Sequence, residues 1–356
     1  MYIILGILFL ILSFLEFIFR KFTIKYLLFI VTALLFVIIQ TKISWAPDLE
    51  SYQYHYFNVH KEEVYTKLEP FHIFFIKFCK NLGLSFDGFY TLYGIIILVP
   101  FFYFIKKVSP LPIMVLSLFY IIPFFPNITQ IRSFLALVIF INAILFYRNN
   151  KFFFYLFYFI SILCHLSMLA SLPIFILAKF KFYYNVKKSF IVISFLLLLM
   201  TLVPKDLIYS KILIFIPKYM FYLEKDISYL GTLGLTFPFF LLNNFVIYHY
   251  HKNKQYFSNQ IKKESYEFLG IIVYFLIYIN YLIILQYFIR DFFRITMFMS
   301  VLSYCYFSII IYYDWMKDSS IIKKHFYRII LLAWAFLAYY INFVMINNAH
   351  MFYIIE

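Results

Sequence analysis

The stretch Asn127-Ile-Thr-Gln-Ile-Arg-Ser-Phe-Leu-Ala136 places a charged side chain at the start of an apolar run. The preceding apolar run ends at Pro126, and Arg132 opens another that continues to Phe146. An ionisable group at the mouth of a membrane helix is costly without a partner, so it marks a functional site by default. Arginine is also well shaped to bind two phosphate oxygens at once. Arg132 is therefore the first candidate catalytic residue, and Gln130, in the polar corner before it, is a candidate for substrate binding.

The composition of the whole chain is that of a membrane protein, since it is 65% hydrophobic, 25% aromatic and only 13% charged. Apolar runs of roughly 18 or more residues recur from end to end, and each can cross a bilayer. They predict an all-α polytopic integral membrane protein of about 11 to 12 spans, with short external amphipathic helices. The runs lie near residues 2–19, 24–41, 88–106, 109–126, 128–147, 152–180, 189–204, 229–249, 265–288, 292–313 and 325–345.

Clusters of lysine and arginine orient these spans, because such clusters gather on the cytoplasmic side of a membrane. Six connections between the spans carry such basic clusters. All six lie on the cytoplasmic side only if the run 152–180 crosses the membrane twice, or nearly so. The alternatives for this run are one tilted helix, or two short arms bent near Ser167 to Pro173. With the double crossing, 19 basic and 4 acidic residues lie inside, against 12 and 11 outside, while Glu16, within the first span, is counted with neither. The basic loops on the cytoplasmic side, which face anionic lipid, then account for the net charge of +15. This charge therefore does not indicate a nucleic-acid-binding surface.

The predicted topology is a single transmembrane domain over residues 1–356, with both termini outside. Its outer side holds the loop 42–87, the mixed-charge amphipathic segment 205–228 and a short arginine-containing corner. Multiple spans and the orientation of the charges predict a multi-pass membrane protein.

The loop 42–87 carries carboxylates and aromatic side chains, which together suit carbohydrate chemistry. Asp48 follows the second span, and Glu69 directly precedes a proline that starts a predicted short helix over 70–82. Tyr52 offers a flat face on which a sugar ring can stack. We assign Asp48 and Glu69 to catalysis and Tyr52 to substrate binding. The alternative is a solvated loop with the tyrosines that are common at membrane interfaces.

Two further polar features lie on the predicted outer side. Arg290 and Arg294 are four residues apart and share one helix face, which predicts a clamp for a diphosphate. Asp291 lies between them, so the alternative is an interfacial cluster that satisfies itself. His165 lies at the outer end of the run 152–180. We assign it as a base or phosphate donor, because histidine changes charge near neutral pH; the alternative is a histidine satisfied by local hydrogen bonds.

Several classes of chemistry have no motif in this sequence. There is no phosphate-binding glycine loop, no dinucleotide fingerprint and no nucleophile elbow. The histidines lack the spacing of a metal site, and the cysteines Cys79, Cys164 and Cys305 have no metal spacing. We therefore predict no metal, no cofactor and no nucleic-acid partner.

These motifs together resemble the EpsG family of polysaccharide polymerases, relatives of the Wzy-type O-antigen and capsule polymerases. The matching features follow one another over roughly residues 40–180. They are Asp48-Leu-Glu-Ser-Tyr52, Glu69-Pro70-Phe71, Gln130-Ile-Arg132-Ser-Phe-Leu-Ala136 and Cys164-His165-Leu-Ser-Met.

The resemblance implies a membrane glycosyltransferase that joins oligosaccharide repeat units carried on undecaprenyl diphosphate at the outer face of the cytoplasmic membrane. Arg132, with Arg290 or Arg294, would stabilise the diphosphate leaving group. Asp48, Glu69 or His165 would orient the acceptor hydroxyl and take its proton. Partners would be the lipid-linked oligosaccharide, membrane lipid, a flippase and a chain-length regulator.

Three other functions stay open on the sequence alone. A polyprenyl-phosphate-sugar-dependent transferase would add one sugar, and its acidic-x-acidic pair would correspond to Asp48 and Glu50. A transporter of lipid-linked oligosaccharide ranks lower, because no inverted repeat is evident and the charges cluster on one face. An acyltransferase ranks last, since no suitable His-Asp pair is present.

Overall fold

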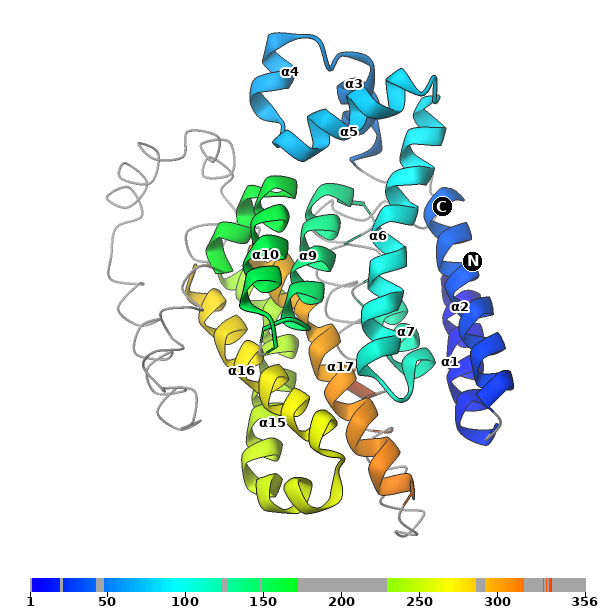
Figure 1. The fold of residues 1–356 in the computed structure, drawn as a ribbon, viewed down its shortest axis with the longest axis vertical. Helices are drawn as coiled ribbons and strands as arrows, with labels where there is room; N and C mark the ends of the chain where they lie inside the picture. Colours follow the sequence, from blue (N-terminus) through cyan, green and yellow to red (C-terminus); the bar gives the residue numbers. More distant parts are fainter. Residues whose placement is uncertain are drawn as a thin grey trace. The chain divides into compact units, whose positions relative to one another are not determined.

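The computed structural model is helical throughout the part of the chain that it describes (Figure 1). That part contains twelve α-helices, one 3-10 helix and no strand, which confirms the all-α class. The chain divides into two compact units, Met1–Leu169 and Ala170–Glu356. A single domain over 1–356 stays a prediction. The described residues are 2–19, 22–42, 48–122, 124, 127, 129–147, 149–171, 229–285, 292–316, 329, 331 and 333–334.

The membrane-length helices match the hydropathy of the sequence. Four described segments are long and apolar enough to cross a membrane: Phe22–Thr41, Phe86–Val108, Lys263–Leu282 and Phe293–Tyr313. Four shorter apolar helices accompany them, Ile4–Ile18, Pro112–Ile121, Ile131–Ile144 and Lys151–Cys164. The predicted runs 189–204 and nearly all of 325–345, and the external segment 205–228, lie outside the described residues.

Six apolar helices form the body of the first unit, and three short helices form the connection between the second and third of them. The six are α1 (Tyr2–Ile18), α2 (Phe22–Lys42), α6 (Phe86–Val108), α7 (Pro112–Ile121), α9 (Ile131–Ile144) and α10 (Lys151–Cys164). The short ones are α3 (Leu49–Phe57), α4 (Glu62–Lys67) and α5 (Pro70–Asn81). Pro70 stands in the first turn of α5, as predicted for a helix over 70–82.

Aromatic side chains fill the core between these helices. Phe9 of α1 lies with its ring centroid 4.5 Å from that of Tyr120 of α7. Phe101 of α6 and Phe119 of α7 are equally close, with centroids 4.5 Å apart. Tilted ring pairs of this kind combine large apolar burial with a favourable edge-to-face component. The aromatic richness of the chain is thus used in packing inside the helix bundle.

A contact between a lysine and a tyrosine shows which helix ends of the first unit lie together. Lys106, at the end of α6, lies with its Nζ 4.4 Å from the centroid of the Tyr26 ring, near the start of α2. These helix ends are therefore at the same end of the bundle, as the predicted topology requires. Figure 1 shows α3, α4 and α5 gathered at the other end, where α2 finishes and α6 begins.

The helix α10 ends at Cys164, within the run 152–180 that the sequence left ambiguous. His165 is extended (φ −159°, ψ 122°), and a 3-10 helix, η1 (Leu166–Ser171), follows. The Nδ1 atom of His165 accepts the backbone N–H of Ser167, a local bond that competes with continuation of the α-helix. A single continuous helix over 152–180 is therefore wrong, and the break lies at His165, slightly before the predicted bend. The return crossing falls outside the described residues and stays a prediction.

The second unit contains three long helices, α15 (Tyr229–Gln260), α16 (Lys263–Leu285) and α17 (Phe292–Met316). A buried polar network joins them, in which Ser303 donates to Asn243 at 3.0 Å and Asn243 donates to Asn280 at 3.4 Å. Such interhelical bonds hold apolar helices together where hydrophobic burial cannot discriminate between neighbours. α15 continues beyond the predicted run 229–249, because hydropathy marks the membrane core and not the helix end.

Candidate active site

Glu69 stands at the N-cap of α5, and its side chain leaves the helix instead of capping it. Its backbone is extended (φ −73°, ψ 149°), and the side chain makes no capping hydrogen bond. Pro70 at the first helical position lacks an N–H, so the first turn has one donor fewer to satisfy. The Glu69 carboxylate therefore reaches other elements of the first unit.

Arg132 meets this carboxylate from the first turn of α9. Its Nη1 lies 2.5 Å from Oε2 of Glu69, a charge-assisted hydrogen bond between residues 63 positions apart in sequence. The side chains of Arg132 and Glu69 are 20% and 15% exposed. On its other side, the guanidinium carbon of Arg132 lies 5.9 Å from the centroid of the Tyr52 ring, a cation–π distance. The pair is thus sheltered yet reachable from the surface.

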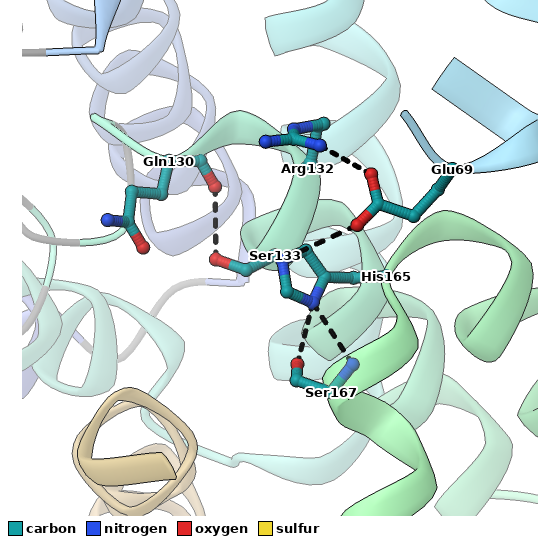
Figure 2. A network of polar contacts seen from close by, with 6 residues as sticks. All are labelled: Glu69, Gln130, Arg132, Ser133, His165 and Ser167. Atoms are coloured by element: carbon teal, nitrogen blue, oxygen red, sulfur yellow. Dashed lines mark hydrogen bonds and ion pairs between the residues drawn. The ribbon is translucent and has the colours of Figure 1, made fainter. Parts of the chain in front are cut away.

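His165 completes the cluster from the end of α10 (Figure 2). Its Nε2 lies 3.9 Å from Oε1 of Glu69. Its Nδ1 lies 2.7 Å from the hydroxyl oxygen of Ser167 and accepts the Ser167 backbone N–H at 3.2 Å. Because Nδ1 is an acceptor, the proton of a neutral ring is on Nε2 and faces the carboxylate. Glu69 therefore lies between a guanidinium and an imidazole N–H.

The electrostatics of the site keep Glu69 ionised. Burial alone would raise the pKa of its carboxyl, but the electrostatic interactions with Arg132 and His165 and the hydrogen bonds outweigh burial and lower that pKa. Burial raises the pKa of Tyr52 above its ordinary value, although Arg132 opposes the shift. The cluster thus presents a carboxylate, a cation and a neutral phenol.

The structure brings some of the predicted site residues together. Glu69, Arg132, His165 and Tyr52 come together from four elements of the first unit. Asp48, at the N-cap of α3, acts on Tyr52 through its charge. These positions do not test the catalytic roles, which stay predictions.

The remaining predicted residues lie around or beyond this cluster. Gln130 is the N-cap of α9, and its backbone carbonyl accepts the Ser133 hydroxyl at 3.2 Å (Figure 2). Arg294 lies in the first turn of α17 in the second unit, and its guanidinium carbon is 5.6 Å from the centroid of the Phe293 ring. Arg290 lies outside the described residues, so the predicted arginine clamp is untested. In the described part, no group of three His, Cys, Asp or Glu side chains could hold a metal ion.

Sequence reasoning gave no role to three polar residues close to this cluster. Ser167 holds the His165 ring, and its signal in the sequence was its place in the motif Cys164-His165-Leu-Ser-Met. His72 and Tyr93 are buried among the aromatic side chains behind Tyr52. In the sequence they look like ordinary residues of an apolar face, because they carry no charge and follow helical spacing.

Apolar membrane-length helices with a sheltered carboxylate, guanidinium and imidazole at one end define an integral membrane protein with a polar side-chain cluster. The chain belongs to the EpsG family, whose sequence profile matches residues 25–355. EpsG family members are Wzy-type polymerases, so this is a membrane protein of polysaccharide polymerisation. The resemblance seen in the short motifs is confirmed over nearly the whole chain. No curated protein and no solved structure showed significant similarity to it.

Proposed function

We propose that this protein joins undecaprenyl-diphosphate-linked oligosaccharide repeat units into a surface polysaccharide at the outer face of the bacterial cytoplasmic membrane. The observation that carries the proposal is the convergence of Glu69, Arg132 and His165 from three separate segments in a chain of the EpsG family. The reaction needs a cation for a diphosphate and a base for a sugar hydroxyl, and the cluster contains both types of group.

The charge distribution of the first unit supports the outward orientation. Lys106 and Lys107 end α6 at the opposite end from the short helices α3 to α5. Basic clusters favour the cytoplasmic side, so the Glu69 cluster would face outward in a multi-pass protein.

Arg132 is proposed to bind the diphosphate of the donor, which is the growing chain on its lipid carrier. A guanidinium has five N–H donors, so phosphate oxygens can bind it beside or in place of Glu69. As the bond from the anomeric carbon to the phosphate oxygen breaks, negative charge develops on the leaving diphosphate. A cation in a sheltered site stabilises that charge more than one in water.

Glu69 is proposed to accept the proton of the acceptor hydroxyl. The acceptor oxygen attacks the anomeric carbon, the hydroxyl proton moves to Glu69, and undecaprenyl diphosphate leaves. The Arg132 guanidinium lowers the pKa of Glu69, which makes the carboxylate a poor base while the two side chains are paired. When a diphosphate binds the guanidinium, Arg132 lowers the pKa of Glu69 less, so the carboxylate becomes more basic. Donor binding would thus prepare the base.

His165 is proposed to position the Glu69 carboxylate. Its Nε2 proton faces Oε1, and its Nδ1 is held by Ser167. Asp48, Tyr52, Gln130 and Arg294 remain candidates for binding the sugar or the lipid diphosphate. A flippase that delivers the repeat units and a chain-length regulator would be its protein partners.

The test is the length of the surface polysaccharide in a deletion strain complemented with wild type or Arg132→Ala at equal protein level. Wild type should restore long chains, whereas Arg132→Ala should leave single lipid-linked repeat units. Lys107→Ala, which removes an exposed cation at the other end of α6, is the matched control and should restore long chains. A deletion strain whose lipid-linked units lack one sugar would instead identify a single-sugar transferase, and normal chains from Arg132→Ala would remove the proposed role of the cluster.

A further inference from the structure

Two buried side chains next to the Glu69 cluster have polar atoms without hydrogen-bond partners among the described residues. They are His72 of α5, at both ring nitrogens, and Tyr93 of α6, at its hydroxyl. His72 is 0% and Tyr93 is 1% exposed. Leaving such groups unsatisfied costs free energy, and proteins rarely do so without a reason. The two groups therefore point to a polar ligand.

The two side chains lie together and close to the reaction site. Their ring centroids are 5.6 Å apart. The Tyr52 ring lies 5.8 Å from the His72 ring, and the same ring is in cation–π contact with Arg132. His72 lies in the first turn of α5, three residues after the N-cap residue Glu69. Tyr52 thus contacts both His72 and the arginine of the Glu69 cluster.

The surroundings select a neutral, hydroxylated ligand. Rings of Tyr52, His55 and Phe89 lie around His72, at centroid distances of 5.8, 6.3 and 6.0 Å. Burial and the nearby charge of Arg132 lower the pKa of His72, so its ring is neutral. A neutral imidazole and a phenol each offer one donor and an acceptor, which complement a hydroxyl group. Phosphate would instead require cations, and Arg132 supplies one nearby.

We propose that His72 and Tyr93 form the acceptor-sugar subsite, in which they bind a hydroxyl group of the incoming repeat unit beside the diphosphate on Arg132. This inference rests on the proposed polymerase function. Tyr52, which contacts His72, belongs to the nine-residue helix α3, so in this proposal the sugar would enter by displacement of this short helix. The aromatic faces then contact the sugar ring while the two polar groups select its hydroxyl pattern.

The experiment uses Tyr93→Phe, which keeps the ring and removes only the hydroxyl. The matched control is Tyr306→Phe, since Tyr306 is also fully buried but its hydroxyl lies 2.9 Å from Nδ1 of His249. Both purified proteins and wild type are compared in thermal unfolding without substrate. They are also compared in polymerisation of the lipid-linked repeat unit isolated from the deletion strain.

We expect Tyr93→Phe to unfold at or above the wild-type temperature, because its hydroxyl has no hydrogen-bond partner to lose among the described residues. Its KM for the repeat unit should rise about 3- to 10-fold, as expected for one lost hydrogen bond, with kcat within about twofold. Tyr306→Phe should show the reverse, a lower unfolding temperature and an unchanged KM. His72→Phe should raise the KM further, and His72→Asn should restore part of the affinity.

Two results would overturn the subsite. One is a wild-type KM for Tyr93→Phe, and the other is a loss of stability equal to that of Tyr306→Phe, which would make the hydroxyl structural. Wild-type protein that does not polymerise the repeat unit would overturn the proposed function itself, and the acceptor subsite with it. The two failures are therefore distinguishable.

Discussion

Glu16 and Glu69 are carboxylates of the same unit that lie at opposite ends and are satisfied by different kinds of partner. Glu16, near the end of α1, is 1% exposed and accepts the backbone N–H groups of Ile113 and Met114 at 3.1 and 3.0 Å. These amides open α7, where the positive end of the helix dipole favours a negative charge. Glu69 instead contacts the side chains of Arg132 and His165 and keeps 15% of its own side chain exposed.

The two carboxylates have different kinds of partner. Backbone amides at a helix start are fixed in place, so Glu16 joins α1 to α7. Side-chain partners can rotate and exchange, so under the proposed function Arg132 would release Glu69 when a phosphate binds. Burial alone therefore does not distinguish the two carboxylates; the kind of partner does.

The largest expected effect comes from Glu69→Gln. This substitution keeps the shape of the side chain and removes the proposed base, so polymerisation should slow by about 100-fold or more. Initial rates on lipid-linked repeat units measure the effect, and the thermal midpoint of the purified variant checks that it is folded. A rate within about threefold of wild type would place the base elsewhere.

Glu16→Ala should show the opposite pattern. Two buried backbone N–H groups of α7 lose their acceptor, which should destabilise the protein by about 2 kcal/mol. Thermal unfolding in detergent measures this loss, and the length of the polysaccharide should remain that of wild type at equal protein level. Glu16→Gln keeps one acceptor oxygen, so its stability should lie between those of wild type and Glu16→Ala. Shortened chains from a well-expressed Glu16 variant would end the distinction between the two carboxylates.

A smaller effect is expected at Ser167, which holds the His165 ring through its hydroxyl and its backbone N–H. Ser167→Ala removes the first contact and keeps the second, so the rate should fall by about 3- to 10-fold. A kcat loss with unchanged KM would agree with a role in positioning. Equal rates would mean that the backbone contact alone orients the ring.

The smallest effect is the response of stability to pH. The pKa of Glu69 lies below its ordinary 4.5, since Arg132 and His165 outweigh burial. A lowered pKa gives stability that is present above the unfolded-state pKa and is lost as pH falls through the folded-state value. Relative to Glu69→Gln, wild type should therefore lose stability below about pH 4.5.

In Arg132→Ala, stability should change with pH in the opposite direction. Without the guanidinium, burial dominates and raises the pKa of Glu69, so this variant should gain relative stability as pH falls from neutral. Thermal midpoints of the three proteins between about pH 7 and about pH 4 provide the comparison. Parallel curves for wild type and Arg132→Ala would show that the ion pair with Arg132 does not control the pKa of Glu69.

The helices of the first unit were largely predictable from the sequence, because hydropathy and proline positions act locally. The span at α6 and the helix starting at Pro70 are examples. Glu69, Arg132 and His165 could each be chosen as candidates, since a charged or titratable residue beside an apolar run is unusual. That they meet could not be predicted, because the contact depends on how α5, α9 and α10 pack.

Other features had no local signal. The role of Glu16 depends on the start of α7, 97 residues away in sequence, and could not be inferred from its own apolar segment. His72 and Tyr93 look like residues of a packed face until the structure leaves their polar atoms without partners in the described part of the chain. The break after Cys164 was expected near this place, but its position depends on the hydrogen bond between His165 and Ser167.

The most direct test of the central claim uses purified protein in liposomes with labelled lipid-linked repeat units. The products and the released undecaprenyl diphosphate are counted for wild type and Arg132→Ala. If the Glu69–Arg132–His165 cluster makes the glycosidic bond, wild type forms chains and releases one undecaprenyl diphosphate for each linkage, while Arg132→Ala produces neither. Chains formed by Arg132→Ala at the wild-type rate, with the same release of carrier, would contradict the account.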